Sequence, residues 1–171
     1  MAKTLATKVD LNLLAQYVDS ADLNAQRGVL SLALSDDLAT GTAANQANLV
    51  WYDTRTLAAT SEQLDLAGVQ RDAFADVATF TKIKTLLIRN KQTTTGLTLT
   101  IGGGTTNPIS TIFGATATNS TETIGPDGWC VKHNPVDGFA VAAGSADTLK
   151  LDAGTNTVVF DILVIGIGTT A

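Results

Sequence analysis

The chain has 171 residues, enough for one domain or for one domain with a small appendage. Only 16% of the residues are charged and 5% are aromatic, while 44% are hydrophobic, and Thr and Ala are the most frequent types. This composition excludes a charged helical bundle and is too apolar for a disordered chain. Thr packs well on a pleated surface, and Gly and Ala fit turns and close contacts, so the composition favours a β protein.

The charge balance and the rare residues exclude several kinds of partner and site. The net charge is −5, from 11 Lys and Arg against 16 Asp and Glu, so we expect no nucleic-acid partner, because that binding requires phosphates to be neutralised. The single cysteine, Cys130, excludes a disulfide within the chain, and the single histidine, His133, excludes a metal site with several imidazoles. No apolar run approaches the roughly 20 residues of a membrane-spanning helix, and the Met-Ala-Lys start lacks the apolar core of a signal peptide. We expect a protein made in the cytoplasm, with no membrane partner, no cofactor, no metal and no enzymatic activity.

The N-terminal segment, residues 1–43, differs in pattern from the rest of the chain. Leu11, Leu14 and Val18 have nearly helical spacing, but the apolar residues at the start of the segment also alternate as in a strand. Residues 8–23 are therefore interpreted as a short helix or an extended arm. A strand at the edge of the main sheet is an equal alternative.

The second half of this segment predicts a strand and then a loop. Residues 28–34 alternate apolar and small residues, which favours a strand. Residues 35–48 are polar or small and have little surface of their own to bury, so they predict a long loop that is mobile or held by a neighbour.

From residue 44 onward the sequence is strongly β in character. Short segments with alternating apolar residues are separated by turn signals, commonly about every 8–12 residues, which is typical of a sandwich or a barrel. In the segment 80–91 the apolar residues occupy both faces near Leu86, as in a strand through the middle of a sandwich. The other strands are predicted at 49–57, 62–68, 97–101, 110–114, 121–124, 128–133, 138–144, 147–154 and 156–168, with a turn or a single helical turn near 70–77. We predict an all-β, jelly-roll-like antiparallel sandwich over 44–171, preceded by an arm or helix in 1–43.

The last predicted strand is apolar on both faces. Between Thr157 and Ile165 the apolar run is interrupted only by Asp161. One face fits the core of the sandwich, so the other must be covered by an appended layer or by another subunit. A subunit interface is the favoured interpretation.

Three motifs that could carry chemistry have simpler explanations. The glycine-rich run 101–104 lacks the Lys-Ser/Thr and the following helix of a phosphate loop, so it predicts a hairpin connection. Cys130 and His133 are three residues apart on a predicted strand, where their side chains diverge to opposite faces and cannot form a nucleophile pair. Asp36, Asp37 and the acidic turns at 125–128 and 134–138 could hold Ca²⁺, but they lack the spacing of an EF-hand loop, and the turns fit ordinary turn chemistry.

The aromatic pair Trp51 and Tyr52 is open to three interpretations. With Asp53 and Arg55 it could form a sugar-stacking platform, or it could anchor a protein contact, since Trp, Tyr and Arg are enriched at such contacts. The alternative is a core Trp51, with Asp53 and Arg55 paired on the outer face of the sheet.

Several segments together resemble a group of small bacteriophage structural proteins. The resemblance lies in the overall pattern of residues 44–68, 80–90, 97–104, 138–154 and 158–166. It implies a jelly-roll sandwich carried on the virion, as a cement (decoration) protein on the outside of the capsid. Such proteins are commonly homotrimers that sit where capsomers meet, so the implied partners are the major capsid protein and further copies of the chain. The resemblance implies no catalytic or ligand-binding residues.

This resemblance leads to expectations about contacts. Residues 1–25 and 36–48 are expected to reach across to the capsid or to a neighbouring subunit, and the end strand and the Trp51 region are expected to help form a trimer. A tail- or head-fibre-associated receptor or carbohydrate-binding jelly roll is the alternative, and it requires exposed coplanar aromatic rings. The candidate interface residues are Leu11, Leu14, Tyr17, Val18, Trp51, Tyr52 and Arg55.

Overall fold

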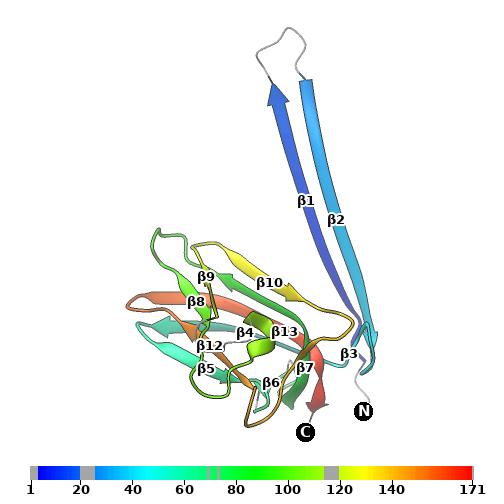
Figure 1. The fold of residues 1–171 in the computed structure, drawn as a ribbon, viewed down its shortest axis with the longest axis vertical. Coiled ribbons are helices and arrows are strands. Elements are labelled where there is room, and N and C mark those ends of the chain that lie inside the picture. Colours follow the sequence, from blue (N-terminus) through cyan, green and yellow to red (C-terminus); the bar gives the residue numbers. More distant parts are fainter. Residues whose placement is uncertain (1–3, 20–25, 69, 73, 114–119, 171) are drawn as a thin grey trace.

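The computed structural model describes residues 4–19, 26–68, 70–72, 74–113 and 120–170. These residues form an almost all-β body, from which a long two-stranded arm projects (Figure 1). The prediction of an all-β antiparallel sandwich is confirmed. The boundary predicted between residues 43 and 44 falls in the turn that follows the arm.

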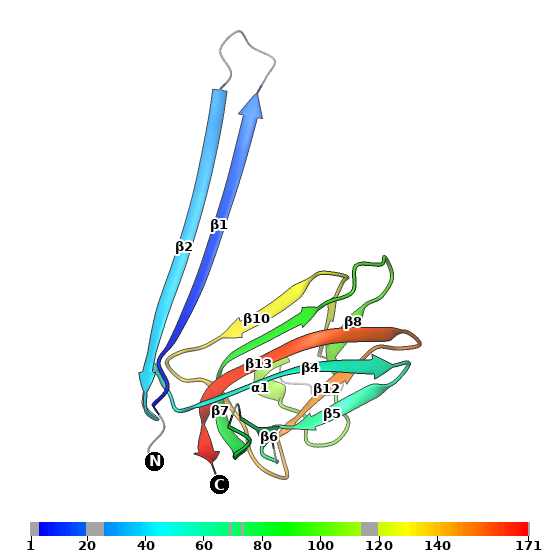
Figure 2. The same cartoon turned by 180° about the vertical axis from the view of Figure 1, so that it is seen from behind.

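Two antiparallel sheets make up the body (Figures 1 and 2). The larger, six-stranded sheet has the order β10-β7-β13-β4, and two short strands, β6 and β11, also pair with β7. Its bounds are β4 Leu49–Ala58, β6 Gln70–Arg71, β7 Val77–Asn90, β10 Trp129–His133, β11 Phe139–Ala140 and β13 Thr157–Thr170. The smaller, four-stranded sheet has the order β5-β12-β8-β9, with β5 Ser61–Asp65, β8 Leu99–Gly102, β9 Thr121–Ile124 and β12 Thr148–Asp152.

The core lies between the two sheets. Alternate residues of β7 and β13 point inward, among them Leu86, Ile88, Phe160 and Ile162, which are fully buried. The smaller sheet contributes a second inward row from β5, β8 and β12: Leu64, Leu99, Ile101, Leu149 and Leu151. We call the side of the six-stranded sheet that faces away from this core its outer face.

Two glycines let β13 pass close to β7. The register between these strands shifts after Ile165 and after Ile167, where β7 has the extra residues Lys84 and Thr81, so β7 is bulged at these points. A Cβ atom at Gly166 or Gly168 would collide with the backbone carbonyl of Lys82 or Thr79, respectively. Only glycine fits these two positions without a shift of the backbone.

The N-terminal segment forms a β-hairpin, which we call the arm. Its strands β1 (Thr7–Asp19) and β2 (Gln26–Thr40) pair in antiparallel register, from Thr7 opposite Leu38 to Asp19 opposite Gln26. The extended arm predicted within residues 8–23 is confirmed for the described part. The prediction of a helix is wrong. The prediction of an edge strand of the main sheet is also wrong, because β1 pairs with β2 and not with that sheet. Residues 1–3 and 20–25 lie outside the described residues.

Two further predictions of local structure are wrong. Residues 35–48 do not form one loop, because β2 continues to Thr40 and β3 (Gln46–Ala47) returns parallel to it. The strand predicted at 110–114 is the short helix α1 (Ser110–Phe113) for its described residues; Ile109 and Ile112, three residues apart, both point into the core. Residue 114 lies outside the described part of the chain.

Candidate interaction surface: the arm and the groove beside it

The arm has one apolar face. Residues directly opposite each other in the hairpin point to the same side, so Leu11 shares a face with Leu34, and Leu13 with Leu32. Much of this face is open to solvent: Tyr17 is 80% exposed and Leu30 is 71% exposed. Its apolar residues are Val9, Leu11, Leu13, Ala15, Tyr17, Leu30, Leu32 and Leu34, with Gly28 near the tip and Asp36 opposite Val9 near the base. An isolated two-stranded hairpin is only marginally stable in water, so this exposed apolar face is a candidate interaction surface.

The opposite face of the arm is mixed in character. Its polar residues include Asn12, Gln16 and Ser31, but Leu14, Val18 and Val29 are also on this side and are exposed. The candidates Leu11, Leu14, Tyr17 and Val18 are therefore all on the arm, but on two different faces: Leu11 and Tyr17 on the apolar face, Leu14 and Val18 on the mixed face.

The base of the arm packs on the outer face of the six-stranded sheet. Leu38 of β2 is 1% exposed and forms a small cluster with Ala47 and Ile165. The Thr40 hydroxyl donates to the Leu5 carbonyl over 2.6 Å and accepts from the Leu5 amide over 3.0 Å. The arm base thus covers the outer side of β13 at Ile165, as the appended-layer interpretation of the last strand expected; Leu163 is only partly covered.

His133 connects the arm to the body. Its Nε2 atom lies 3.1 Å from Asp36 Oδ2 of β2, and its Nδ1 atom lies 2.9 Å from the Thr85 hydroxyl of β7. Cys130 points the other way into the core, where burial raises the pKa of its thiol to about 11. The predicted divergence of Cys130 and His133 is confirmed. The contact with Asp36, 97 positions away in the chain, was not predicted.

The turn after β10 makes a second connection between the body and the chain next to the arm. Lys84 is 1% exposed, and its Nζ atom donates to the carbonyls of Pro135 (2.9 Å) and Val136 (2.7 Å). Burial lowers the pKa of Lys84, so the bonds to these carbonyls stabilise a costly buried cation. The Pro135 carbonyl also accepts from the Asn45 amide over 2.9 Å, which ties this turn to the chain just beyond the arm.

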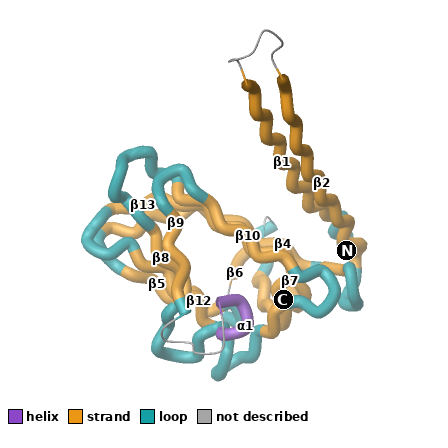
Figure 3. Tube along the Cα trace, turned by 45° about the horizontal axis from the view of Figure 1, so that its top comes forward, coloured by secondary structure: helices purple, strands orange, loops and turns teal. Residues whose placement is uncertain are grey.

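A groove of about 560 Å³ lies between the arm and the body. Val9, Asp10 and Leu11 of β1 line one wall. The other wall is the outer face of the sheet, with Thr85, Leu87 and Arg89 of β7, and Asp127, Trp129 and Val131 in and before β10. In the ribbon and tube views the arm leans away from the body beyond its base (Figures 1, 2 and 3).

The sheet wall of the groove continues as an apolar row across four strands. Val131 of β10 is opposite Leu87 of β7, Leu87 is opposite Leu163 of β13, and Leu163 is opposite Tyr52 of β4. Beside this apolar row, on the same wall, Arg89 Nη2 lies 2.7 Å from Asp127 Oδ1, so these two charges are already paired. The groove therefore offers apolar contacts flanked by neutralised charges.

The aromatic pair of β4 divides between the two faces. Trp51 is 3% exposed in the core, so a partner cannot reach it without opening the sandwich, whereas Tyr52 is exposed on the outer face. The two rings cannot form one sugar-stacking platform. Arg55 lies over the Trp51 ring, 5.7 Å from its centroid, and pairs with Asp53 and Glu62. The pairing of Arg55 with Asp53 is as predicted, but both residues are on the inward-facing side of β4, half-buried at its rim, and not on the outer face.

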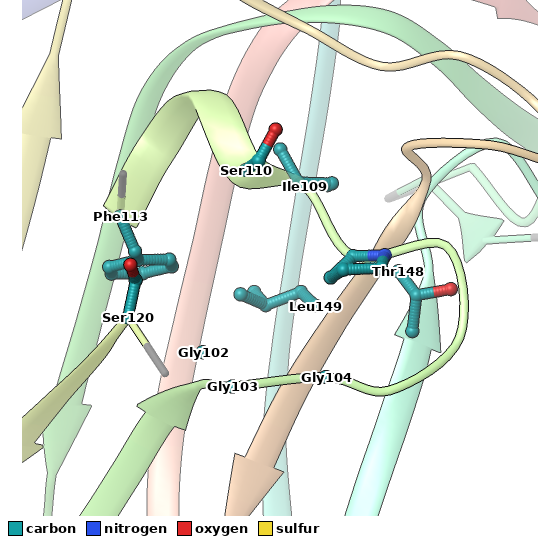
Figure 4. Close-up of a pocket in the computed structure, with 10 residues that line it drawn as sticks. Gly102, Gly103, Gly104, Ile109, Ser110, Phe113, Ser120, Thr148 and Leu149 are labelled. Carbon is teal, nitrogen blue, oxygen red and sulfur yellow. The ribbon is translucent and has the colours of Figure 1, made fainter. Parts of the chain in front are cut away.

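The glycine-rich turn holds only a very small cavity, of about 10 Å³ (Figure 4). Leu149 and Phe113 fill the space above Gly102–Gly104. A cavity of this size is at the limit for one water molecule, so the turn has no room for a phosphate group. The glycines instead lead from β8 towards α1 and β9, which pairs antiparallel with β8.

Within the described residues no group of three or more His, Cys, Asp and Glu side chains could hold a metal ion. Asp127 and Asp36, from two of the acidic segments considered for Ca²⁺, pair with Arg89 and His133. In the same part of the chain, no helix is long and apolar enough to cross a membrane.

Comparisons with family models, curated proteins and solved structures found no match.

The ion pair between Glu122 and Lys132 predicts a loss of stability in acid. Lys132 Nζ donates to Glu122 Oε2 over 2.7 Å, and this bond holds the pKa of Glu122 below its usual value. Its contribution is present above about pH 4.3, the ordinary glutamate value, and is lost as the pH falls through the lower pKa of the folded state. Because both side chains are partly exposed, we expect less than about 1 kcal/mol. Urea unfolding at pH 7 and pH 3 should show a smaller pH effect in Glu122→Gln than in the unchanged chain; equal effects would contradict the assignment.

Proposed function

We propose that this protein is a virion structural protein, a cement protein that binds the outer surface of a bacteriophage capsid and bridges neighbouring subunits. Its role is mechanical and not enzymatic, its body is a jelly roll, and its partners are the major capsid protein and further copies of itself in a homotrimer. The observation that carries the proposal is the arm, which extends a long apolar face away from the body. The resemblance of residues 44–171 to small phage structural proteins supports it.

A cement protein acts by binding the assembled shell more tightly than its loosened form. At a concentration 100-fold above the dissociation constant, such binding stabilises each site by about 2.7 kcal/mol. This requires contact surface and a rigid body, which the buried core and the braced arm base supply. It requires no acid, base or metal.

The test is binding to purified shells. Capsid shells of the phage that encodes the chain, stripped of it, are mixed with the purified protein and sedimented. We expect saturable co-sedimentation, and shells that withstand a higher temperature before they open. A protein that stays in the supernatant, or that sediments only with purified tails, would overturn the proposal.

A second candidate, carbohydrate binding on a tail or head fibre, is favoured by one observation. Trp129 is exposed at the groove beside Arg89 and Asp127, the kind of aromatic and polar setting in which sugars stack. This candidate predicts glycan binding that Trp129→Ala abolishes and Tyr52→Ala does not. Glycan binding with no shell binding would select it over the cement function.

A further inference from the structure

We propose that the groove between the arm and the outer face of the six-stranded sheet receives the arm of a second copy of this chain, and that in the oligomer each copy gives one arm and receives one. This inference rests on the structural role proposed above and deepens it, because it names the partner and the place of contact. Figure 2 shows the arm and the six-stranded sheet, and the groove between them is lined by residues of β1, β7 and β10.

The first argument is continuity with a contact that already exists within the chain. At the base, Leu38 of the arm packs against Ile165 on the outer face of the sheet, next to Leu163. Further along, the arm leans away and leaves two apolar surfaces uncovered. These are the rest of the arm, and the row that runs from Val131 through Leu87 towards Tyr52. The outer face of the sheet is thus already suited to this hairpin, and a second arm would extend the same kind of packing.

The second argument is that the arm suits a position between two walls. Leu13 and Leu32 on its apolar face are exposed, but so are Leu14 and Val29 on the mixed face. A surface ribbon that lies on one partner needs only one apolar face. A ribbon with exposed apolar side chains on both faces fits the groove, which has the neighbour's β1 on one side and its sheet on the other.

The third argument is charge. Residues 11–18 and 28–34 of the arm contain no charged side chain. In the groove, Arg89 and Asp127 neutralise each other, and Asp10 lies 3.4 Å from Lys8. Insertion of a second arm would therefore bury no unpaired charge, which is the costliest fault of an interface.

The fourth argument is area. The paired part of the arm from Leu11 to Val18 is about 27 Å long at 3.4 Å per residue and about 10 Å wide, so each face offers roughly 270 Å². When each copy gives one arm and receives one, it buries both faces of its arm and one strip of its sheet. The total is roughly 800 Å² per copy, the size of a standard stable interface. A single arm laid on an unrelated surface would bury about a third of this.

The test is a cross-link between two differently marked copies. One carries Leu13→Cys or Leu14→Cys on the arm with an affinity tag, and the other carries Val131→Cys in the groove without a tag. Native Cys130 is buried and its thiol pKa is raised, so the cross-linking of the unchanged chain gives the background signal. After mixing and treatment with a short bis-maleimide, we expect a covalent tagged–untagged pair. Mixtures in which one of the two partners lacks its engineered cysteine serve as the negative control.

A second measurement does not depend on cross-linking. The double variant Leu13→Ser and Leu32→Ser should raise the dissociation constant of self-association by at least about 100-fold in sedimentation velocity. Val136→Ser removes an exposed apolar side chain that does not line the groove and keeps the backbone carbonyl to which Lys84 donates, so it should leave the dissociation constant unchanged. Circular dichroism checks that all variants keep the sheet signal.

Three outcomes would overturn the inference. One is a monomer at every concentration together with no cross-linked pair. Another is an oligomer that Leu13→Ser and Leu32→Ser leave intact. The third is an arm that cross-links only to the shell protein when shells are added; in that case the capsid occupies the groove, and the cement function survives without the arm exchange. Self-association through the arm without any binding to shells would overturn the cement function and leave the arm exchange standing.

Discussion

Shortening the arm to its base is expected to abolish both self-association and binding to capsid shells, while the sandwich stays folded. Lys8 and Asp37 are opposite each other in the hairpin, so residues 9–36 can be replaced by an Asn-Gly turn that joins them. The variant keeps Leu38 and its contacts with Ile165, but it loses the exposed apolar surface of the arm. We expect a monomer by sedimentation velocity and no co-sedimentation with shells.

The shortened chain also loses the contact between Asp36 and His133. His133→Gln in the full-length chain is therefore the matched control, because it removes that contact and leaves the arm in place. The control should still bind shells and self-associate. If the shortened chain binds as tightly as the full chain, another surface makes the contacts and the role assigned to the arm is wrong.

Replacing Phe160 by Ala is expected to lower the free energy of unfolding by about 3–5 kcal/mol. Phe160 is fully buried on β13, the strand that pairs with both β7 and β4, so the lost ring leaves a cavity in the middle of the core. In a chain of this size the midpoint of thermal unfolding should fall by about 10 °C. Denaturant unfolding followed by circular dichroism measures the effect.

Val159→Ala is the matched control for this substitution. Val159 is the preceding residue, half-buried on the outer face, and its truncation should cost about 1 kcal/mol or less. Similar losses in the two variants would mean that the inward and outward faces of β13 are assigned wrongly.

Much of the body could be predicted because its strands have local patterns of apolar residues that are typical of β structure. The alternation along β12 and the two-sided apolar run of β7 and β13 follow directly from which faces are buried. The helix α1 was missed because Thr, Ile and Phe also favour strands, and only the core contacts of Ile109 and Ile112 distinguish the two.

The arm shows where local pattern reaches its limit. Leu11, Leu14 and Val18 fit a helix as well as a strand, and the pairing of Leu11 with Leu34 decides the matter. That pairing is between distant residues and leaves no mark in the spacing of either strand. Apolar residues on both strands were visible, but only their register shows that they gather on one face of a ribbon.

The braces at the arm base could not be predicted for the same reason. His133 meets Asp36 across 97 positions, and Lys84 meets Pro135 across 51. Buried Lys84 also contradicts the ordinary expectation that lysine alternates outward in a strand, and the two carbonyls that accept from its ammonium group explain the exception. Such contacts follow from the fold and not from the neighbouring residues.

Hydrogen–deuterium exchange of the arm amides tests most directly whether the arm is an assembly element. The amides of β1 and β2 are measured in the intact protein at micromolar concentration, after dilution, and with shells present. Burial against a partner predicts slow exchange in the concentrated or shell-bound protein and faster exchange on dilution of the free protein. Equally fast exchange along the arm under all three conditions would show a hairpin that nothing covers, and would contradict the account.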